Sequence, residues 1–308
     1  MPHLNRSTRF SSKLLIAASL FVSSTIAIAP AQADSLQNAT IGGTAATDYL
    51  LYDANATNTF LSPNANLQTI LIGTAANPTG NVELAASSEK VGFDFTKNTT
   101  LNGTIGGRAI SISSLTASDW SSSYRGTTFG QYWFDSALTS NGLRNMVGTS
   151  ASTTLFNVFK NNGGFQRFSD PNISYVSQDA NNVINIGLAG HYNASSLFTK
   201  SIDQYVATTR LSNSQRRMMA GLKSELSSKV IQASEVVKTT YEGKTDYGFS
   251  FVATKSGLVE KSDNLSHTGN YVISRQGIEP VNKKVPEPSI VLGLIALGGL
   301  AKRKLRRR

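Results

Sequence analysis

Histidine is the side chain that most often carries acid–base chemistry near neutral pH, and this sequence of 308 residues holds three. His3 lies in an N-terminal segment that we expect to be removed, which leaves His191 and His267. A nucleophilic triad needs a serine and a carboxylate beside one of them, but serine is too common here for its proximity to carry information. No Gly-x-Ser-x-Gly elbow or His-Glu-x-x-His zinc motif occurs. We therefore expect turn or strand-end histidines, no catalytic residues and no enzymatic activity.

Acidic residues near the two tryptophans form a second group with chemical meaning. Asp119 precedes Trp120, and Asp135 follows Trp133 by two positions. A pair of carboxylates beside rings that stack on sugars would suit a secreted carbohydrate-active enzyme or a sugar-binding module, and this alternative stays open. Trp133 stands at helical spacing from Ala137, which favours a position in the core for its ring.

Metal and cofactor chemistry has one candidate site. Asp170, Asn172 and Asp179 carry oxygen atoms of the kind that Ca²⁺ binds, with Asn181 and Asn182 close behind. Their spacing matches neither the EF-hand loop nor the nine-residue calcium repeat, and ordinary turn chemistry explains the same residues. The sequence contains no cysteine, which excludes a thiol nucleophile and any Cys-ligated metal. No cofactor is expected.

The N-terminus has the pattern of a secretory signal peptide over residues 1–33. Arg6, Arg9 and Lys13 precede an apolar run over residues 14–28. The small residues Ala31 and Ala33 then form an Ala-x-Ala site, which predicts cleavage before Asp34. We therefore expect signal peptidase and the secretion machinery to act on the chain and deliver it across the inner membrane.

The C-terminus, residues 286–308, combines three features in a fixed order. Pro286, Glu287 and Pro288 come first, and a short apolar stretch over 289–301 follows, which we expect to be a transmembrane helix. The chain then ends in a cluster of basic residues over 302–308, which we expect to stay cytoplasmic. The basic residues are Lys302, Arg303, Lys304, Arg306, Arg307 and Arg308.

This order of motif, apolar stretch and basic tail resembles the PEP-CTERM sorting signal of Gram-negative bacteria, cyanobacteria included. In that family an exosortase, an integral membrane enzyme, recognises the signal and cuts near the Pro-Glu-Pro. The resemblance, which covers the last 24 of 308 residues, implies an exosortase as processing partner and transient membrane anchoring. It also implies a final place at the cell surface or outside the cell, in association with exopolysaccharide. The stretches 165–176 and 186–191 are similar to PEP-CTERM proteins of unknown function. A plain C-terminal membrane anchor is the alternative.

The positive charge of the chain belongs to its two ends. The formal net charge is +10, but three of the 29 Lys and Arg precede Asp34 and six follow Ala301. Residues 34–285 keep 20 basic residues against 18 acidic ones. The mature region is therefore nearly neutral, and its charge does not indicate a nucleic-acid partner.

The pattern of apolar residues predicts an α+β fold with a β-rich N-terminal half, central helices and a C-terminal β-hairpin. Period-two alternation and turn residues indicate strands over 49–52, 67–72, 91–95, 99–105, 108–115, 173–176, 183–188 and 271–273. Helical spacing indicates helices over 129–140, 152–161, 201–211 and 215–226. The hairpin is expected over 230–253, with Gly243 in its turn.

The same pattern divides the chain into segments. We expect a mature extracytoplasmic domain over 34–275, with a sub-boundary near 116–128, and a polar linker over 276–285 before the C-terminal signal.

Overall fold

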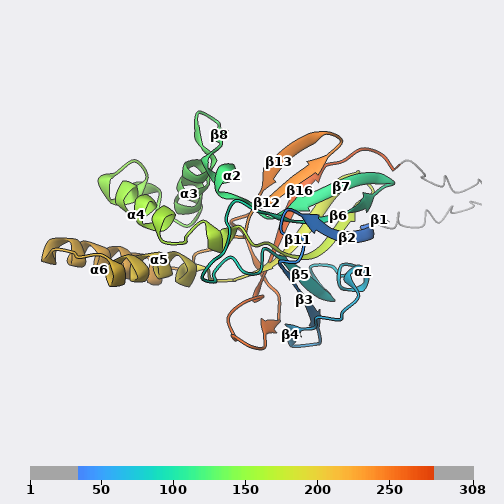
Figure 1. Cartoon of the computed structure of the whole chain (residues 1–308), viewed down its shortest axis with the longest axis horizontal. Coiled ribbons are helices and arrows are strands. Elements are labelled where there is room, and N and C mark those ends of the chain that lie inside the picture. Colours follow the sequence, from blue (N-terminus) through green and yellow to red (C-terminus); the bar gives the residue numbers. More distant parts are fainter. Residues whose placement is uncertain (1–33, 281–308) are drawn as a thin grey trace, which may run out of the picture. The chain divides into compact units, whose positions relative to one another are not determined.

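The structure is a computed structural model that describes residues 34–280. Its larger sheet draws strands from both ends of this range (Figure 1). These are β1 (Asp34–Ser35), β3 (Tyr49–Ala54), β4 (Asn58–Leu61), β5 (Gly80–Leu84), β10 (Asn172–Gln178), β11 (Val183–Gly190), β14 (Thr254–Lys255), β15 (Val259–Glu260) and β16 (Gly269–Gln276). Their order is β14-β16-β11-β10-β5-β3-β4-β15, with β1 paired to β10. Neighbours run antiparallel except β4 and β15, which run parallel.

A second sheet has five strands in the order β13-β12-β7-β6-β2. In chain order they are β2 (Gln37–Gly43), β6 (Thr99–Ile105), β7 (Arg108–Ser113), β12 (Val237–Tyr241) and β13 (Lys244–Gly248). Gly106 and Gly107 both have positive φ in the β6–β7 turn, a conformation that glycine adopts without steric cost. Two further short strands, β8 (Ser123–Tyr124) and β9 (Thr127–Thr128), pair only with each other.

Apolar side chains from both sheets meet in one buried cluster. Leu101 and Ile110 come from the smaller sheet, and Ile184 and Ile186 come from β11 of the larger one. The alternation along each strand places these residues on the inner face, as expected for two sheets packed face to face. This cluster holds the strands whose ends carry the site described below.

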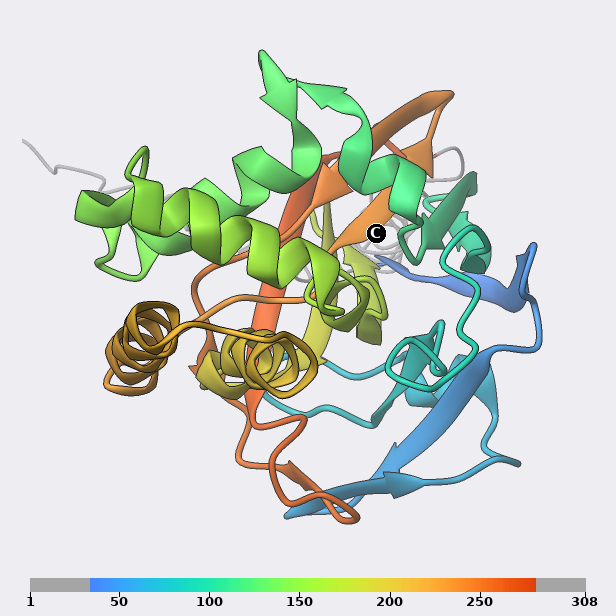
Figure 2. The same ribbon diagram turned by 60° about the vertical axis from the view of Figure 1, so that its left-hand side comes forward.

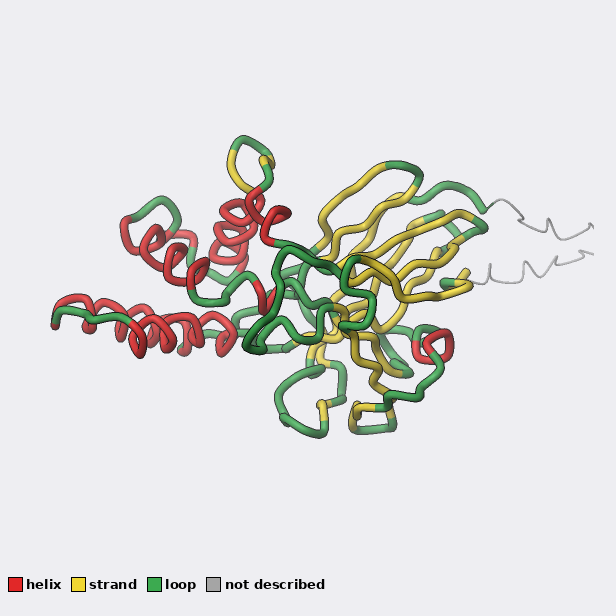
Figure 3. The backbone as a smooth tube through the Cα atoms, viewed as in Figure 1, coloured by secondary structure: helices red, strands yellow, loops and turns green. Residues whose placement is uncertain are grey.

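The helices gather at one end of the sheets and enclose an aromatic core of their own (Figures 1 and 3). They are α2 (Ala117–Ser121), α3 (Phe129–Ser140), α4 (Ser150–Asn161), α5 (Ser195–Thr208) and α6 (Asn213–Ser227), with the 3₁₀ turns η1 (Arg144–Met146) and η2 (Gln166–Phe168). A short helix, α1 (Leu67–Ile70), lies apart from them. Figure 2 shows α5 beside α6, and α4 packs on α5. The ring of Trp133 is fully buried among Phe159, Phe168 and Phe198.

Local capping explains why the helices begin where they do. The Thr128 hydroxyl accepts a hydrogen bond from the N–H of Gln131 at the start of α3. Ser212 and Gln215 form a reciprocal capping box at the start of α6. These caps satisfy N–H groups that have no partner within the helix. The predicted helices over 129–140, 152–161 and 215–226 are confirmed, and the one predicted over 201–211 begins earlier, at Ser195.

The predicted fold class is wrong. The described chain is β-rich from one end to the other, and its strands are not divided between an N-terminal half and a C-terminal hairpin. The hairpin does exist as β12 and β13, but β12 pairs with β7 and so belongs to the same sheet as strands more than 100 residues earlier. Pairing between distant strands depends on tertiary packing, which a local pattern does not encode.

Two short strand predictions are also wrong, for identifiable local reasons. Residues 67–70 form α1 because the Asn66 side chain accepts a hydrogen bond from the N–H of Thr69 and so caps a helix. Residues 91–95 form turns, where the Asp94 carboxylate accepts from the N–H and the hydroxyl of Thr96. In both places a polar side chain supplies a turn that competes with the strand ladder.

The described residues do not support the predicted transmembrane helix. Over 34–280, no helix is long and apolar enough to cross a membrane. The stretch 289–301, on which that prediction was placed, lies outside the described residues.

Candidate ligand pocket

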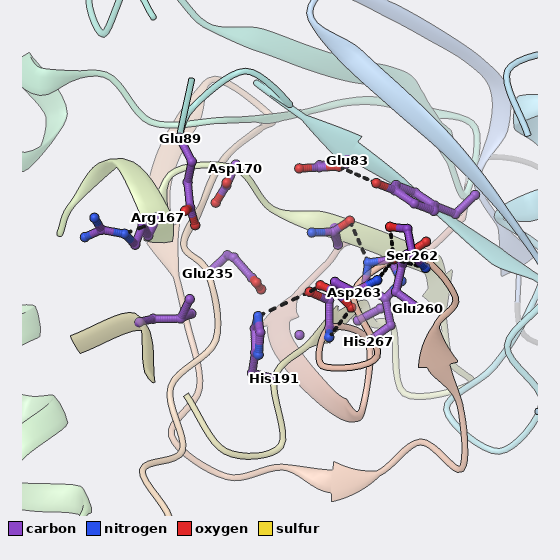
Figure 4. Close-up of a pocket in the computed structure, with 16 residues that line it drawn as sticks. Glu83, Glu89, Arg167, Asp170, His191, Glu235, Glu260, Ser262, Asp263 and His267 are labelled. Atoms are coloured by element: carbon purple, nitrogen blue, oxygen red, sulfur yellow. Dashed lines mark hydrogen bonds and ion pairs between the residues drawn. The ribbon is translucent and has the colours of Figure 1, made fainter. Parts of the chain in front are cut away.

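A polar cavity of about 190 Å³ opens where the larger sheet meets the helices (Figure 4). Strands β3 and β5 contribute Tyr52 and Glu83, and α5 contributes Leu197. The loop from β15 to β16 closes the opposite side with residues 260–267. The remaining lining residues are Glu89, Arg167, Asp170, Asn172, Ala189, Gly190, His191 and Glu235. Six of the lining residues are acidic, which sets the chemistry of the cavity.

Burial raises the pKa of three of these carboxyl groups and so favours their protonated form. Burial, with Asp170 nearby, raises the pKa of Glu83 to about 8. Burial also raises the pKa of Asp170 to about 7, with a further rise from Glu89. Burial and the neighbouring Asp170 raise the pKa of Glu235 well above its ordinary value. Neutral carboxyl groups can donate hydrogen bonds, so this side of the cavity offers donors as well as acceptors.

The Glu235 side chain has an unsatisfied oxygen atom in the cavity, where the buried Arg167 Nε atom also lacks a hydrogen-bond partner among residues 34–280. Glu235 is only 6% exposed, yet its Oε2 atom has no hydrogen-bond partner among residues 34–280. Figure 4 shows its carboxyl group directed into the cavity between Asp170 and His191. An unsatisfied buried carboxyl oxygen costs free energy, so a bound ligand is the simplest partner for it.

The loop after β15 supplies a second kind of carboxylate. Although partial burial on its own raises the pKa of Asp263, hydrogen bonds from the Ser266 hydroxyl and from the N–H groups of Leu265 and Ser266 outweigh it and lower that pKa. Glu260 is held in the same way by the Ser262 N–H and hydroxyl, at 2.8 and 2.5 Å, and by the Asp263 N–H at 3.0 Å. These bonds organise the loop around the cavity.

Both histidines of the mature region line the cavity and are neutral. Burial lowers the pKa of His267 to about 4, and its ring nitrogens face Thr59 Oγ1 at 2.7 Å and Asn172 Oδ1 at 3.2 Å. Burial also lowers the pKa of His191, whose Nε2 lies 3.4 Å from Ser266 Oγ. The Ser266 hydroxyl donates to Asp263 instead. The order of partners is therefore not that of a triad, in which histidine stands between serine and carboxylate.

The tryptophans and their acidic neighbours lie elsewhere. Trp120 is 3% exposed and stacks on Phe165, and the Trp133 ring is fully buried. Asp119 accepts hydrogen bonds from Lys238, and Asp135 accepts one from Gln131. The structure therefore places neither tryptophan where its ring face could stack on a sugar.

The three candidate calcium ligands are split between two places. Asp170 and Asn172 both line the cavity. Asp179 lies in the β10–β11 turn, where its Oδ1 accepts from the N–H groups of Asn181 and Val183. In the part of the chain that the structure describes, no three or more His, Asp or Glu residues are grouped to hold a metal ion.

Of the residues predicted at the two termini, the structure describes only Asp34. It begins β1 and pairs with Gln178. Ala31 and Ala33, Pro286 to Pro288, and the basic tail over 302–308 lie outside the described residues.

Sequence reasoning missed most of the cavity. Its acidic residues come from four separate segments, around positions 83–89, 170, 235 and 260–263, and no local spacing joins these segments. One signal was present: Glu235 is the lone charge in Ile231-Gln-Ala-Ser-Glu-Val-Val237, a run with buried apolar positions. A carboxylate in such a run is rarely tolerated without a specific role.

The comparisons with known proteins bear on the C-terminus alone. No curated protein and no solved structure matches the chain. One family model does match, that of the PEP-CTERM protein-sorting motif, over residues 284–308. The match includes Pro286, Glu287 and Pro288 and continues through the basic tail. The chain thus carries at residues 284–308 the PEP-CTERM protein-sorting motif, the C-terminal signal that an exosortase recognises.

Proposed function

We propose that this protein is a non-catalytic component of the cell surface or extracellular matrix that binds a sugar unit of exopolysaccharide in its acidic cavity. The sorting motif supports the proposed location, because it implies export, transient membrane anchoring and processing by an exosortase. The free carboxyl oxygen of Glu235 supports the binding activity.

The size and polarity of the cavity suit one sugar unit. Pockets for drug-sized ligands enclose ~300–1,000 Å³ and are mainly apolar, whereas this cavity encloses about 190 Å³ and is lined mainly by polar groups. Each sugar hydroxyl both donates and accepts a hydrogen bond. Glu235 and Asp170 can donate to such hydroxyls when they are protonated, a form that their raised pKa values favour, and Asp263 and the Asn172 side chain can accept from them.

Glycoside hydrolysis is the second candidate function. It needs a protonated acid on one side of the bond and an ionised carboxylate on the other, and the pKa values of Glu235 and Asp263, which line one cavity, are shifted in these two opposite directions. We favour binding because the Asp263 carboxylate is already held by three hydrogen bonds from its own loop, which lowers its reactivity as a nucleophile.

Calorimetry on the mature protein, purified from the surface fraction of its host, tests the binding activity. The ligands are oligosaccharides prepared from the host's own exopolysaccharide. We expect saturable binding that Glu235→Gln weakens at least about tenfold, as expected for loss of a buried hydrogen-bond partner, while Glu225→Gln on exposed α6 leaves it unchanged. Absence of binding by the unaltered protein would overturn the proposal, and release of new reducing ends would favour the hydrolase instead.

Intact-mass analysis of the surface fraction, with and without the host's exosortase, tests the sorting step. We expect a species that begins at Asp34 and ends near Pro286, and only where the exosortase is present. A Pro286→Ala, Glu287→Ala double variant should keep the mass of the basic tail. A protein that retains Arg308 in both strains would contradict exosortase processing and indicate a plain anchor.

A further inference from the structure

Charge around the cavity is unbalanced. Among the described residues that line it, Arg167 is the only Lys or Arg, against six acidic residues. Its guanidinium group is engaged elsewhere. The Arg167 Nη1 atom donates to the Asn162 carbonyl at 3.1 Å and to the Ser201 hydroxyl at 2.9 Å. Its Nε atom lies 3.8 Å from Glu89, and Figure 4 shows the guanidinium turned away from Glu235. Arg167 therefore forms its ion pair with Glu89 and acts on Asp170 only at longer range.

The inner carboxyl groups are those of Glu83, Asp170 and Glu235, and their hydrogen-bond partners are neutral. Glu83 accepts from the Tyr52 hydroxyl at 3.1 Å, and Asp170 accepts from the Ser88 hydroxyl at 2.5 Å. Glu235 Oε2 accepts from nothing among residues 34–280. Within the same range no Lys or Arg forms an ion pair with any of the three. Three buried carboxyl groups that interact with one another are normally stabilised by a cation.

Backbone geometry keeps the Glu235 oxygen open to the cavity. A Cβ atom on Gly190 would lie 3.0 Å from Glu235 Oε2 and 3.2 Å from the Tyr271 ring. The absence of a side chain at this position gives the carboxyl group room beside β11. His191, which follows Gly190, is neutral and brings no positive charge to this wall.

We infer that the ligand unit is cationic, and specifically that the cavity takes an amino sugar with a free, protonated amine whose ammonium group lies among Glu83, Asp170 and Glu235. This inference rests on the proposed function and names its substrate class. An ammonium group has three donors, and one of them would satisfy the free Glu235 Oε2 atom. Its charge would give Glu235 the cationic partner that no ion pair among the described residues supplies. An N-acetylated or other neutral sugar presents no cation and would leave these carboxyl groups without a cationic partner.

Proton release must accompany such binding. An ammonium group favours the ionised form of each carboxyl group, so the protons held by Glu83, Asp170 and Glu235 leave as the ligand enters. Other charged or titratable groups near them are Lys90, Asp48, Glu89, Arg167, Tyr52, Tyr271, Glu260, Asp263 and the two histidines. His267 and His191 have lowered pKa values and stay neutral above pH ~6.5. Affinity should therefore rise with pH across the range in which the carboxyl groups ionise and the amine stays protonated.

The matched ligands are a glucosamine trisaccharide and its fully N-acetylated counterpart, which differ only in the charge of the nitrogen. Calorimetry on the mature protein should give an affinity at least about 30-fold higher for the free amine, as befits a desolvated charge pair. The heat of binding should change between two buffers of different ionisation enthalpy, because protons are released. Glu235→Gln, which keeps the shape of the side chain, should remove most of the preference for the amine, and Glu225→Gln should leave it intact.

The outcomes separate the two proposals. Equal affinity for both trisaccharides would overturn the inference while leaving sugar binding in place. Tighter binding of the N-acetylated ligand would overturn it too. Binding of exopolysaccharide fragments without binding of either trisaccharide would also count against the amine. If no sugar of any kind binds, the proposed function itself fails. The ligand comparison needs no variant, so a Glu235→Gln protein that fails to fold does not weaken the test.

Discussion

Lys238 Nζ lies 2.9 Å and 3.1 Å from the two carboxylate oxygens of Asp119, and this pair ties β12 to the first turn of α2. Asp119 also accepts from the N–H and the hydroxyl of Thr116 and from the Tyr247 hydroxyl. One buried carboxylate thus joins the smaller sheet to the helical part. Burial on its own raises the pKa of Asp119, but the hydrogen bonds from Lys238 and Thr116 outweigh it, so this pKa lies below its ordinary value.

Replacing Asp119 should therefore destabilise the protein. Asp119→Ala removes the helix cap and leaves the partly buried Lys238 ammonium without its partner. We expect the free energy of unfolding to fall by about 2–4 kcal/mol. Urea unfolding followed by circular dichroism measures it. Asp246→Ala, at a carboxylate that is 74% exposed, is the control and should change stability by less than about 0.5 kcal/mol. Equal effects of the two substitutions would show that the Asp119 pair is not structural.

The burial of both tryptophans in the aromatic core leads to a prediction about their fluorescence on ligand binding. The two tryptophans are 3% and 0% exposed, so neither should respond to a sugar in the cavity. Saturating ligand should leave the tryptophan emission maximum and its quenching by acrylamide unchanged. Trp133→Ala should lower the free energy of unfolding by about 3–5 kcal/mol, because it opens a cavity among four phenylalanine rings. A shift of the emission maximum on binding would place a tryptophan in the site.

Stability should fall as the pH rises through the neutral range. Burial, with Asp170 nearby, raises the pKa of Glu83 from 4.5 to about 8, so the folded chain keeps a proton that the unfolded chain has lost. The stabilisation from this bound proton is complete below pH 4.5, the pKa of Glu83 in the unfolded chain. It is lost as the pH rises past about 8, the pKa in the folded chain. We expect the free energy of unfolding to drop by roughly 5 kcal/mol across this range, since each pKa unit corresponds to about 1.4 kcal/mol.

Glu83→Gln provides the control for that pH dependence. Glutamine stays neutral at every pH, so the variant should show a flatter profile and greater stability than the unaltered protein above pH ~8. Thermal unfolding at a series of pH values measures both profiles. A profile that rises with pH in the unaltered protein would contradict the assignment of a protonated Glu83.

Sequence patterns predicted the structure correctly where one short segment contains all the residues that determine it. The helix over 129–140 has its cap and its apolar face within 13 residues, and the β6–β7 hairpin has both strands and its glycine turn within 15. The larger sheet has no such local signal, because β5 pairs with β10 about 90 residues later. The cavity is assembled from the ends of those distant strands. Glu83 and Glu235 meet only once the sheet exists, so no spacing in the sequence could have paired them.

Two glycines with opposite surroundings give a last prediction about packing. A Cβ atom on Gly187 would come within 2.1 Å of the Tyr175 ring, across the β10–β11 pair, whereas a Cβ atom on Gly221 in α6 would meet nothing within 4 Å. Gly187→Ala should therefore force the tyrosine out of place and lower the free energy of unfolding by about 1–3 kcal/mol. Gly221→Ala should raise it by about 0.5–1 kcal/mol, because alanine restricts the unfolded chain and favours the helix. Chemical denaturation of both variants measures the two changes. Changes of the same sign would mean that the tyrosine does not lie against β11, and the strand pairing that builds the cavity would have to be redrawn.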